Sequence, residues 1–128
     1  MPEQSGMSAA DLLLLDPDGT FPSRLAEDRA VLAGLAHGLW KAAAEAKQRR
    51  LAKIEALAHR LGGAAGTFGY EAVSAAALEL EDRIATWRGA ADPAGSRSAI
   101  EARGAIDAQI EDGLAHLVKA LDDVVEGR

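Results

Sequence analysis

The chain has 128 residues, of which 48% are hydrophobic and only 4% aromatic, a composition typical of one helical domain with small side chains. Its formal net charge of −6 argues against nucleic acid and anionic membranes as partners. The absence of cysteine excludes disulfides, a thiol nucleophile and cysteine-ligated zinc. The one dense apolar run, Leu12 to Leu15, is too short for a signal peptide or a membrane span, so we expect a cytoplasmic protein.

The N-terminal part of the chain carries little pattern. Residues 1–8 are small, polar and unpatterned, and we expect them to be flexible. The four leucines at positions 12–15 can form one helical turn before the sequence DPDG forces a turn. We expect this short N-terminal helix to cover one end of the domain.

Four longer helices follow, each predicted from apolar residues that recur at steps of three and four. The first spans about residues 22–47 with a poorly marked join near Gln48, and the others span about 49–65, 70–88 and 97–126. A loop, GAADPAGS, precedes the last helix, and no segment alternates as a strand does. The apolar stripes are Leu25, Leu32, Leu35, Leu39 and Ala43; Leu51, Ile54, Ala58, Leu61 and Ala65; Val73, Ala77, Leu80, Ile84 and Trp87; and Ile106, Ile110, Leu114, Leu117, Leu121 and Val124.

Helices with one apolar stripe each bury those stripes against one another. We therefore predict an all-α fold: an antiparallel four-helix bundle with a short extra N-terminal helix. The whole chain, 1–128, forms a single domain in this interpretation, and its core bundle spans about residues 22–126.

His59 stands in a glycine-rich part of the second predicted helix, AHRLGGAAGTFG. Glycine in a helix is less favourable than alanine by about 1 kcal/mol, so its repeated use requires a reason. Gly62 and Gly63 follow His59 by three and four residues and share its helix face. We therefore predict that His59 is exposed on a flat surface to which a convex partner docks. The residues of this docking face are Glu55, Ala56, Arg60, Gly62, Gly63 and Gly66.

The stretch from His59 to Gly69 resembles the signature of histidine phosphotransfer (HPt) domains of bacterial phosphorelays. That signature reads His, any residue, Leu, Lys, Gly, any residue, Ala, three residues, Gly. The positions that fit it are His59, Leu61, Gly63, Ala65 and Gly69. The ending GTFG is similar to that of the phosphotransfer domain of chemotaxis kinases, and the sequence LELED follows in the next helix. The resemblance covers about residues 22–126.

The resemblance implies that His59 accepts a phosphoryl group from a receiver-domain aspartate and passes it to another receiver. The implied partners are a hybrid sensor histidine kinase and a response regulator, whose receiver domain brings the Mg²⁺. No cofactor or metal is then expected on this chain, which we expect to be monomeric. No nucleotide-binding motif is present, so we expect no autonomous kinase activity.

In the family, the phosphorylated atom is Nε2, and the other ring nitrogen bonds a Glu or Gln that here corresponds to Glu81. Glu81 also lies on the flank of the inward stripe of its own helix, within reach of a neighbouring helix. A carboxylate there would orient the ring, fix the tautomer and support the positive charge that develops on attack. The resemblance thus makes His59 the nucleophile and Glu81 the residue that orients it.

One position departs from the signature, since the usual lysine three residues after the histidine is Gly62. Arg60 points about 100° further round the helix. Arg83 and Lys53 are the other candidate cations. The departure bears on the lifetime of the phosphorylated form and on the transfer rate.

Two other functions are compatible with the sequence. Glu55 with His59, and Asp112 with His116, are each four residues apart, so a metal-binding bundle enzyme is one alternative. The other is an adaptor that uses the same surface without phosphorylation. A bound metal would support the first, and a functional His59→Gln variant would support the second.

Overall fold

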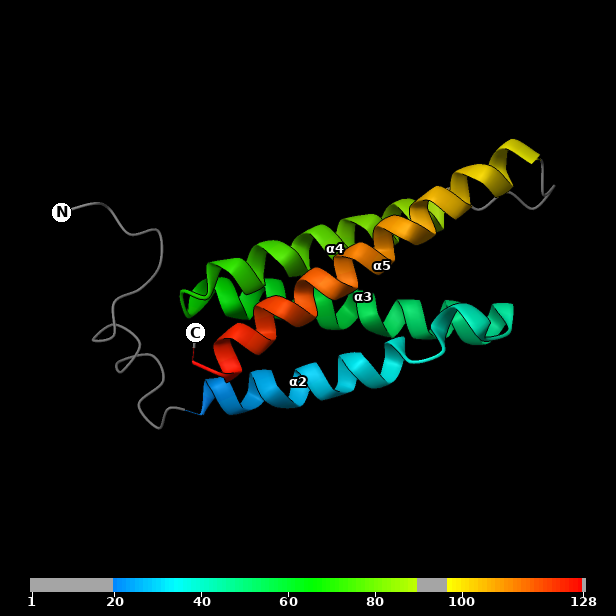
Figure 1. Ribbon diagram of the computed structural model, residues 1–128. Coiled ribbons are helices and arrows are strands. Elements are labelled where there is room, and N and C mark those ends of the chain that lie inside the picture. The colour runs from blue at the N-terminus through cyan, green and yellow to red at the C-terminus, as the bar shows by residue number, and fades with distance from the viewer. Residues whose placement is uncertain (1–19, 90–96, 128) are drawn as a thin grey trace.

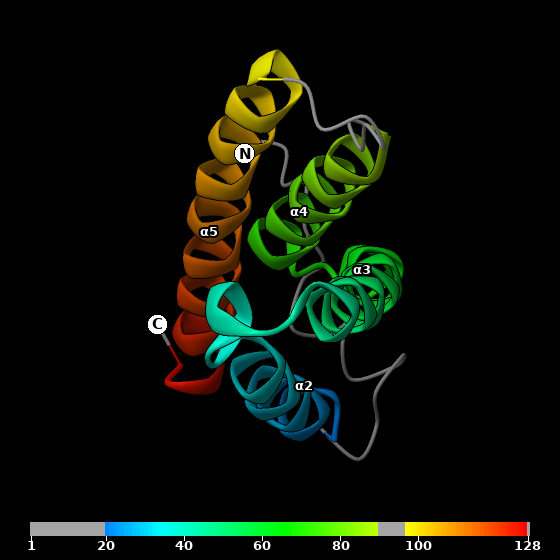
Figure 2. The ribbon, with the colours of Figure 1, turned by 90° about the vertical axis from the view of Figure 1, so that its right-hand side faces the viewer.

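The computed structural model describes residues 20–89 and 97–127, without the side chains of 97–103. Its helices are α2 (Phe21–Ala36), the 3-10 turn η1 (Leu39–Lys41), α3 (Ala44–Thr67), α4 (Glu71–Gly89) and α5 (Arg97–Val125). Successive helices run antiparallel, and α2 closes the bundle by packing against both α3 and α5 (Figures 1 and 2). The predicted all-α four-helix bundle is confirmed. The predicted helical turn at 12–15 and the flexible residues 1–8 lie outside the described residues.

The first predicted helix, 22–47, is wrong at its C-terminal end. The helix stops at Ala36, and Gly38 takes the left-handed conformation with φ 67°. Glycine adopts this conformation without a steric penalty, so the chain can turn there. The turn directs Leu39 into the core, where it is 1% exposed. Leu39 therefore reaches its predicted buried position from a 3-10 turn after the helix.

The next helix begins at Ala44, five residues before the predicted start at Arg49. Ala43, predicted as the last member of the first apolar stripe, is instead the exposed residue before this helix. The Arg50 guanidinium donates a 2.6 Å hydrogen bond to the His37 carbonyl and so fixes the connection against α3. The error arose because the alanine-rich sequence around the join favours helix throughout.

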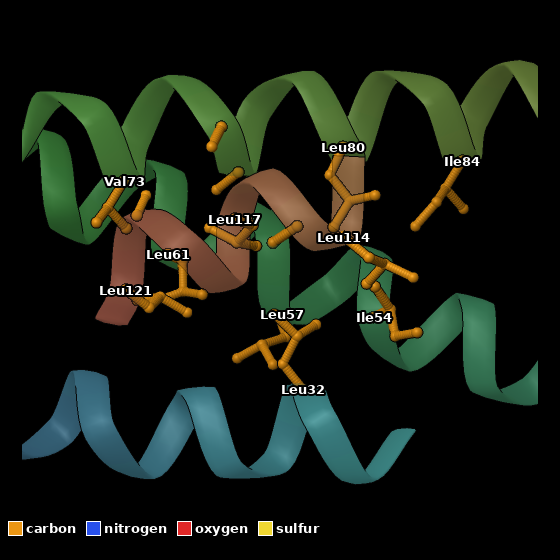
Figure 3. Close-up of a cluster of buried hydrophobic side chains, with 14 of the residues drawn as sticks. Leu32, Ile54, Leu57, Leu61, Val73, Leu80, Ile84, Leu114, Leu117 and Leu121 are labelled. Carbon is orange, nitrogen blue, oxygen red and sulfur yellow. The ribbon is translucent and has the colours of Figure 1, made fainter. Parts of the chain in front are cut away.

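The core lies between the four helices and is made almost entirely of aliphatic side chains (Figure 3). The predicted stripes of α3 and α4 are buried at all ten positions, from Leu51 to Ala65 and from Val73 to Trp87. On α5 the four central stripe residues, Ile110, Leu114, Leu117 and Leu121, are buried as well. The stripe pattern therefore identified the inward faces of these three helices correctly.

The turn between α3 and α4 determines how these helices align. Gly69 has φ 83°, and the Tyr70 amide donates a 2.8 Å hydrogen bond to the Ala65 carbonyl, closing the end of α3. Phe68 and Tyr70 then stack on Phe21, with ring centroids 4.2 and 5.5 Å from it. This aromatic cluster holds the start of α2 against the turn.

Candidate functional site

The site is built on the antiparallel pair α3 and α4, which meet at three successive levels. His59 contacts Glu81, Gly62 lies beneath Leu78, and Gly66 lies beside Ser74. Each level is about one helical turn from the next, which is the spacing of residues three or four apart. The turn at residues 68–70 fixes this alignment of the two helices, and the alignment places Glu81 opposite His59.

His59 is exposed on this face, with 75% of its side chain accessible. Its Nδ1 lies 2.8 Å from Oε2 of Glu81, whose side chain is 27% exposed. An ionised carboxylate can only accept, so this hydrogen bond is made when Nδ1 carries the proton. In that tautomer Nε2 holds the free lone pair and is the ring nitrogen available for reaction with a group outside the protein.

The predicted position of Gly62 on an open surface is wrong. Gly62 is buried, and a Cβ atom added to it would lie 2.5 Å from Cδ2 of Leu78. The hydroxyl of Ser74 donates a 2.7 Å hydrogen bond to the Gly62 carbonyl. Glycine is therefore used here because α4 approaches α3 closely, and not to clear the surface around His59.

The other residues of the predicted docking face have different environments. Gly63, Gly66 and Ala56 are exposed, and no atom lies within 4 Å of the Cβ position of Gly63. Glu55 is partly buried and forms an ion pair with Arg88 of α4. The open part of the surface next to His59 is thus smaller than the sequence predicted.

The three candidate cations named from the sequence do not pair with His59 or Glu81. The Arg60 guanidinium lies 2.8 Å from a carboxylate oxygen of Asp28 on α2. Arg83 donates a 2.7 Å hydrogen bond to the Gln109 carbonyl of α5. Lys53 is exposed, six residues before His59.

The described residues contain no group of three or more His, Cys, Asp or Glu side chains that could hold a metal ion. Glu55, one of the candidate ligands, is engaged by Arg88. The Nδ1 atom of His116, another candidate, lies 3.9 Å from Glu79 of α4. Neither i, i+4 pair of the metal-enzyme alternative therefore belongs to a metal-binding group in the described part of the chain.

Comparison with known proteins agrees with this geometry. The family model named Hpt domain matches residues 21–125, which is most of the chain. The chain belongs to the Hpt domain family. Hpt domains are phosphotransfer modules of phosphorelays that interact with kinase and receiver domains of two-component systems. Searches of curated proteins and of solved structures gave no significant match.

Among the helices of this Hpt domain, none in the described part of the chain is long and apolar enough to cross a membrane.

Leu78 packs over Gly62 at this site but is not among the site residues predicted from the sequence. The sequence could have indicated Leu78, because it is a large apolar residue outside the inward stripe of its helix and lies three residues before Glu81.

Proposed function

We propose that this Hpt domain is a phosphorelay intermediate in which His59 carries the phosphoryl group. The hydrogen bond between Nδ1 of His59 and Glu81 on a largely exposed ring is the observation that supports this most directly. It gives one reactive nitrogen, a fixed ring orientation and access for a partner at the same place.

The proposed reaction is a reversible in-line transfer. The Nε2 lone pair of His59 attacks the phosphorus of a receiver's aspartyl phosphate, a P–N bond forms, and the P–O bond to the aspartate breaks. The ring then carries a positive charge, because Nδ1 keeps its proton. Glu81 stabilises that charge through its hydrogen bond. The second transfer reverses these steps with the aspartate of another receiver as acceptor.

The proposed partners are a hybrid sensor histidine kinase as the source and a response regulator as the destination. Phosphoryl transfer depends mainly on positioning and on neutralising charge, which the Mg²⁺ in the receiver's acidic pocket supplies. The proposal accordingly requires no metal or cofactor on this chain. It also includes no kinase activity of its own, so labelling of the pure monomeric protein by ATP alone would contradict it.

Intact-mass measurement after incubation with phosphoramidate tests the proposal without a partner. Wild type should gain one acid-labile phosphoryl group, and His59→Gln should gain none. His116→Gln is the matched control, because His116 is also exposed, with 62% of its side chain accessible, but lies on α5 away from Glu81. Loss of labelling in the control, or its survival in His59→Gln, would contradict the assignment. Intact signalling in cells by His59→Gln would instead support the adaptor alternative.

A further inference from the structure

Leu78 is one of three large hydrophobic residues exposed in the described part of the chain, the others being Val31 and Val125. Its side chain lies directly over Gly62, and 47% of the residue is exposed. Val31 and Val125 lie on α2 and α5. Leu78 is thus the exposed apolar residue that belongs to the α3–α4 face carrying His59.

Leu78 also fills the space into which a side chain at position 62 would extend. Besides the 2.5 Å approach of Cδ2, Cγ of Leu78 would lie 2.8 Å from a Cβ atom at this position. Side chains on a helix lean toward its N-terminus, so a long side chain at 62 would point back toward position 59. Leu78 therefore obstructs one place from which this helix could direct a cation at His59.

The arginines around the site are each held by another partner than His59 or Glu81. Arg60 is held by Asp28 on α2, and Arg88 is held by Glu55. Arg83 is bound to Gln109 on α5 and to Glu79 on its own helix, 2.7 and 3.3 Å away. In the described residues, the α4 side chain one turn from His59 toward the C-terminal end of α3 is the apolar side chain of Leu78.

We propose that Leu78 is a positioning residue of the phosphoryl site: seated over Gly62, it excludes from position 62 a cationic side chain that would reach the phosphoryl group on His59. This inference rests on the proposed function. In the absence of a receiver, an adjacent ammonium would pair with the oxygens of the phosphohistidine, stabilise it and so slow its spontaneous hydrolysis. Without one, the phosphoryl group stays labile, and the positive charge comes with the receiver. The domain is then suited to rapid transfer and not to storage.

The test compares the lifetime of phosphohistidine in two double variants of the full chain, Gly62→Lys/Leu78→Ala and Gly62→Met/Leu78→Ala. Both open the space over position 62, and their new side chains have similar length, but only one carries charge. After loading with phosphoramidate and removal of the reagent, intact mass follows loss of the phosphoryl group. The lysine variant should retain it about two- to fivefold longer, as expected for an exposed ion pair. The difference should shrink at 1 M salt because the charges are screened.

Equal lifetimes in the two double variants would overturn the inference. Failure of wild type to accept any phosphoryl group would instead refute the proposed function. Leu78→Lys against Leu78→Met provides a second comparison if position 62 does not tolerate a side chain, because Leu78 is partly exposed and Gly62 is left unchanged. The same lengthening is expected with lysine, and its absence would count equally against the inference.

Melting temperatures test whether Leu78 is the obstruction. Leu78→Ala should lower the melting temperature of wild type, which loses apolar contact, but raise that of Gly62→Lys, which gains space. Equal decreases in both backgrounds would show that Leu78 does not exclude a side chain from position 62, and would also overturn the inference.

Discussion

Glu81 accepts a hydrogen bond from His59 across the interface of two helices, with 2.8 Å between Nδ1 and Oε2, although 22 residues separate them in the sequence. The same alignment places Leu78 over Gly62 one turn further along. Both contacts depend on the turn at Phe68, Gly69 and Tyr70, because a shift of either helix by one residue would rotate the paired side chains apart.

Replacing Glu81 by alanine should slow phosphoramidate labelling of His59 by about tenfold, the rate equivalent of one charge-assisted hydrogen bond. Glu81→Gln keeps an acceptor for Nδ1 but removes the negative charge, so its rate should fall between those of wild type and Glu81→Ala. Intact mass against time gives the rates. Glu79→Gln, on the exposed side of the same helix, is the control and should label as wild type does.

Two neighbouring glycines should differ in their response to alanine. Gly63→Ala should stabilise the fold by about 0.5–1 kcal/mol, because its Cβ position is open and alanine favours helix. Gly62→Ala should be less stable than Gly63→Ala by about 1 kcal/mol or more, because the new methyl group displaces Leu78. Urea unfolding of both variants measures the difference, and equal stabilities would contradict the close approach of α4.

The central leucine of α5 should be important for stability. Leu117 is 0% exposed and lies in the core between the helices (Figure 3), so Leu117→Ala should destabilise the protein by about 2–5 kcal/mol. Val125→Ala serves as the comparison on the same helix, because Val125 is 43% exposed and its truncation should change stability by less than about 1 kcal/mol. Chemical denaturation followed by circular dichroism measures the free energy of unfolding of both variants. An equal loss of stability in the two would contradict the position of Leu117 in the core.

An ion pair connects α2 with α5, the first and last described helices. Nε of Arg29 lies 2.5 Å from a carboxylate oxygen of Asp122, and this hydrogen bond raises the pKa of Arg29. The raised pKa of Arg29 means that the stabilising effect of this guanidinium is present at neutral pH and is lost as strongly alkaline pH deprotonates it.

Asp122→Asn should therefore lower the melting temperature at low salt, and the decrease should become smaller at 1 M salt as the charges are screened. Lys119→Gln, which breaks a pair within α5 only, should have a smaller effect. A decrease that does not depend on salt would show that Asp122 acts through packing and not through its charge.

The sequence predicted most of what depends on local pattern. Steps of three and four between apolar residues identified the inward faces of α3, α4 and α5, because a helix buries the face on which its apolar residues recur. The same pattern failed at the join between α2 and α3. There alanine-rich sequence continues through the turn, and Gly38 ends the helix without any break in the helical propensity of its neighbours.

The fold class and the exposure of His59 could be predicted from the sequence alone, since a pattern of fixed spacing on one helix requires no knowledge of its neighbours. The burial of Gly62 could not, because Leu78 and Ser74 come from another helix and reach Gly62 only once α3 and α4 are aligned. The sequence determined which helix faces exist, through the 3.6-residue period. The tertiary structure decided which of them meet, because side chains from separate helices approach one another only after the turns between them have formed.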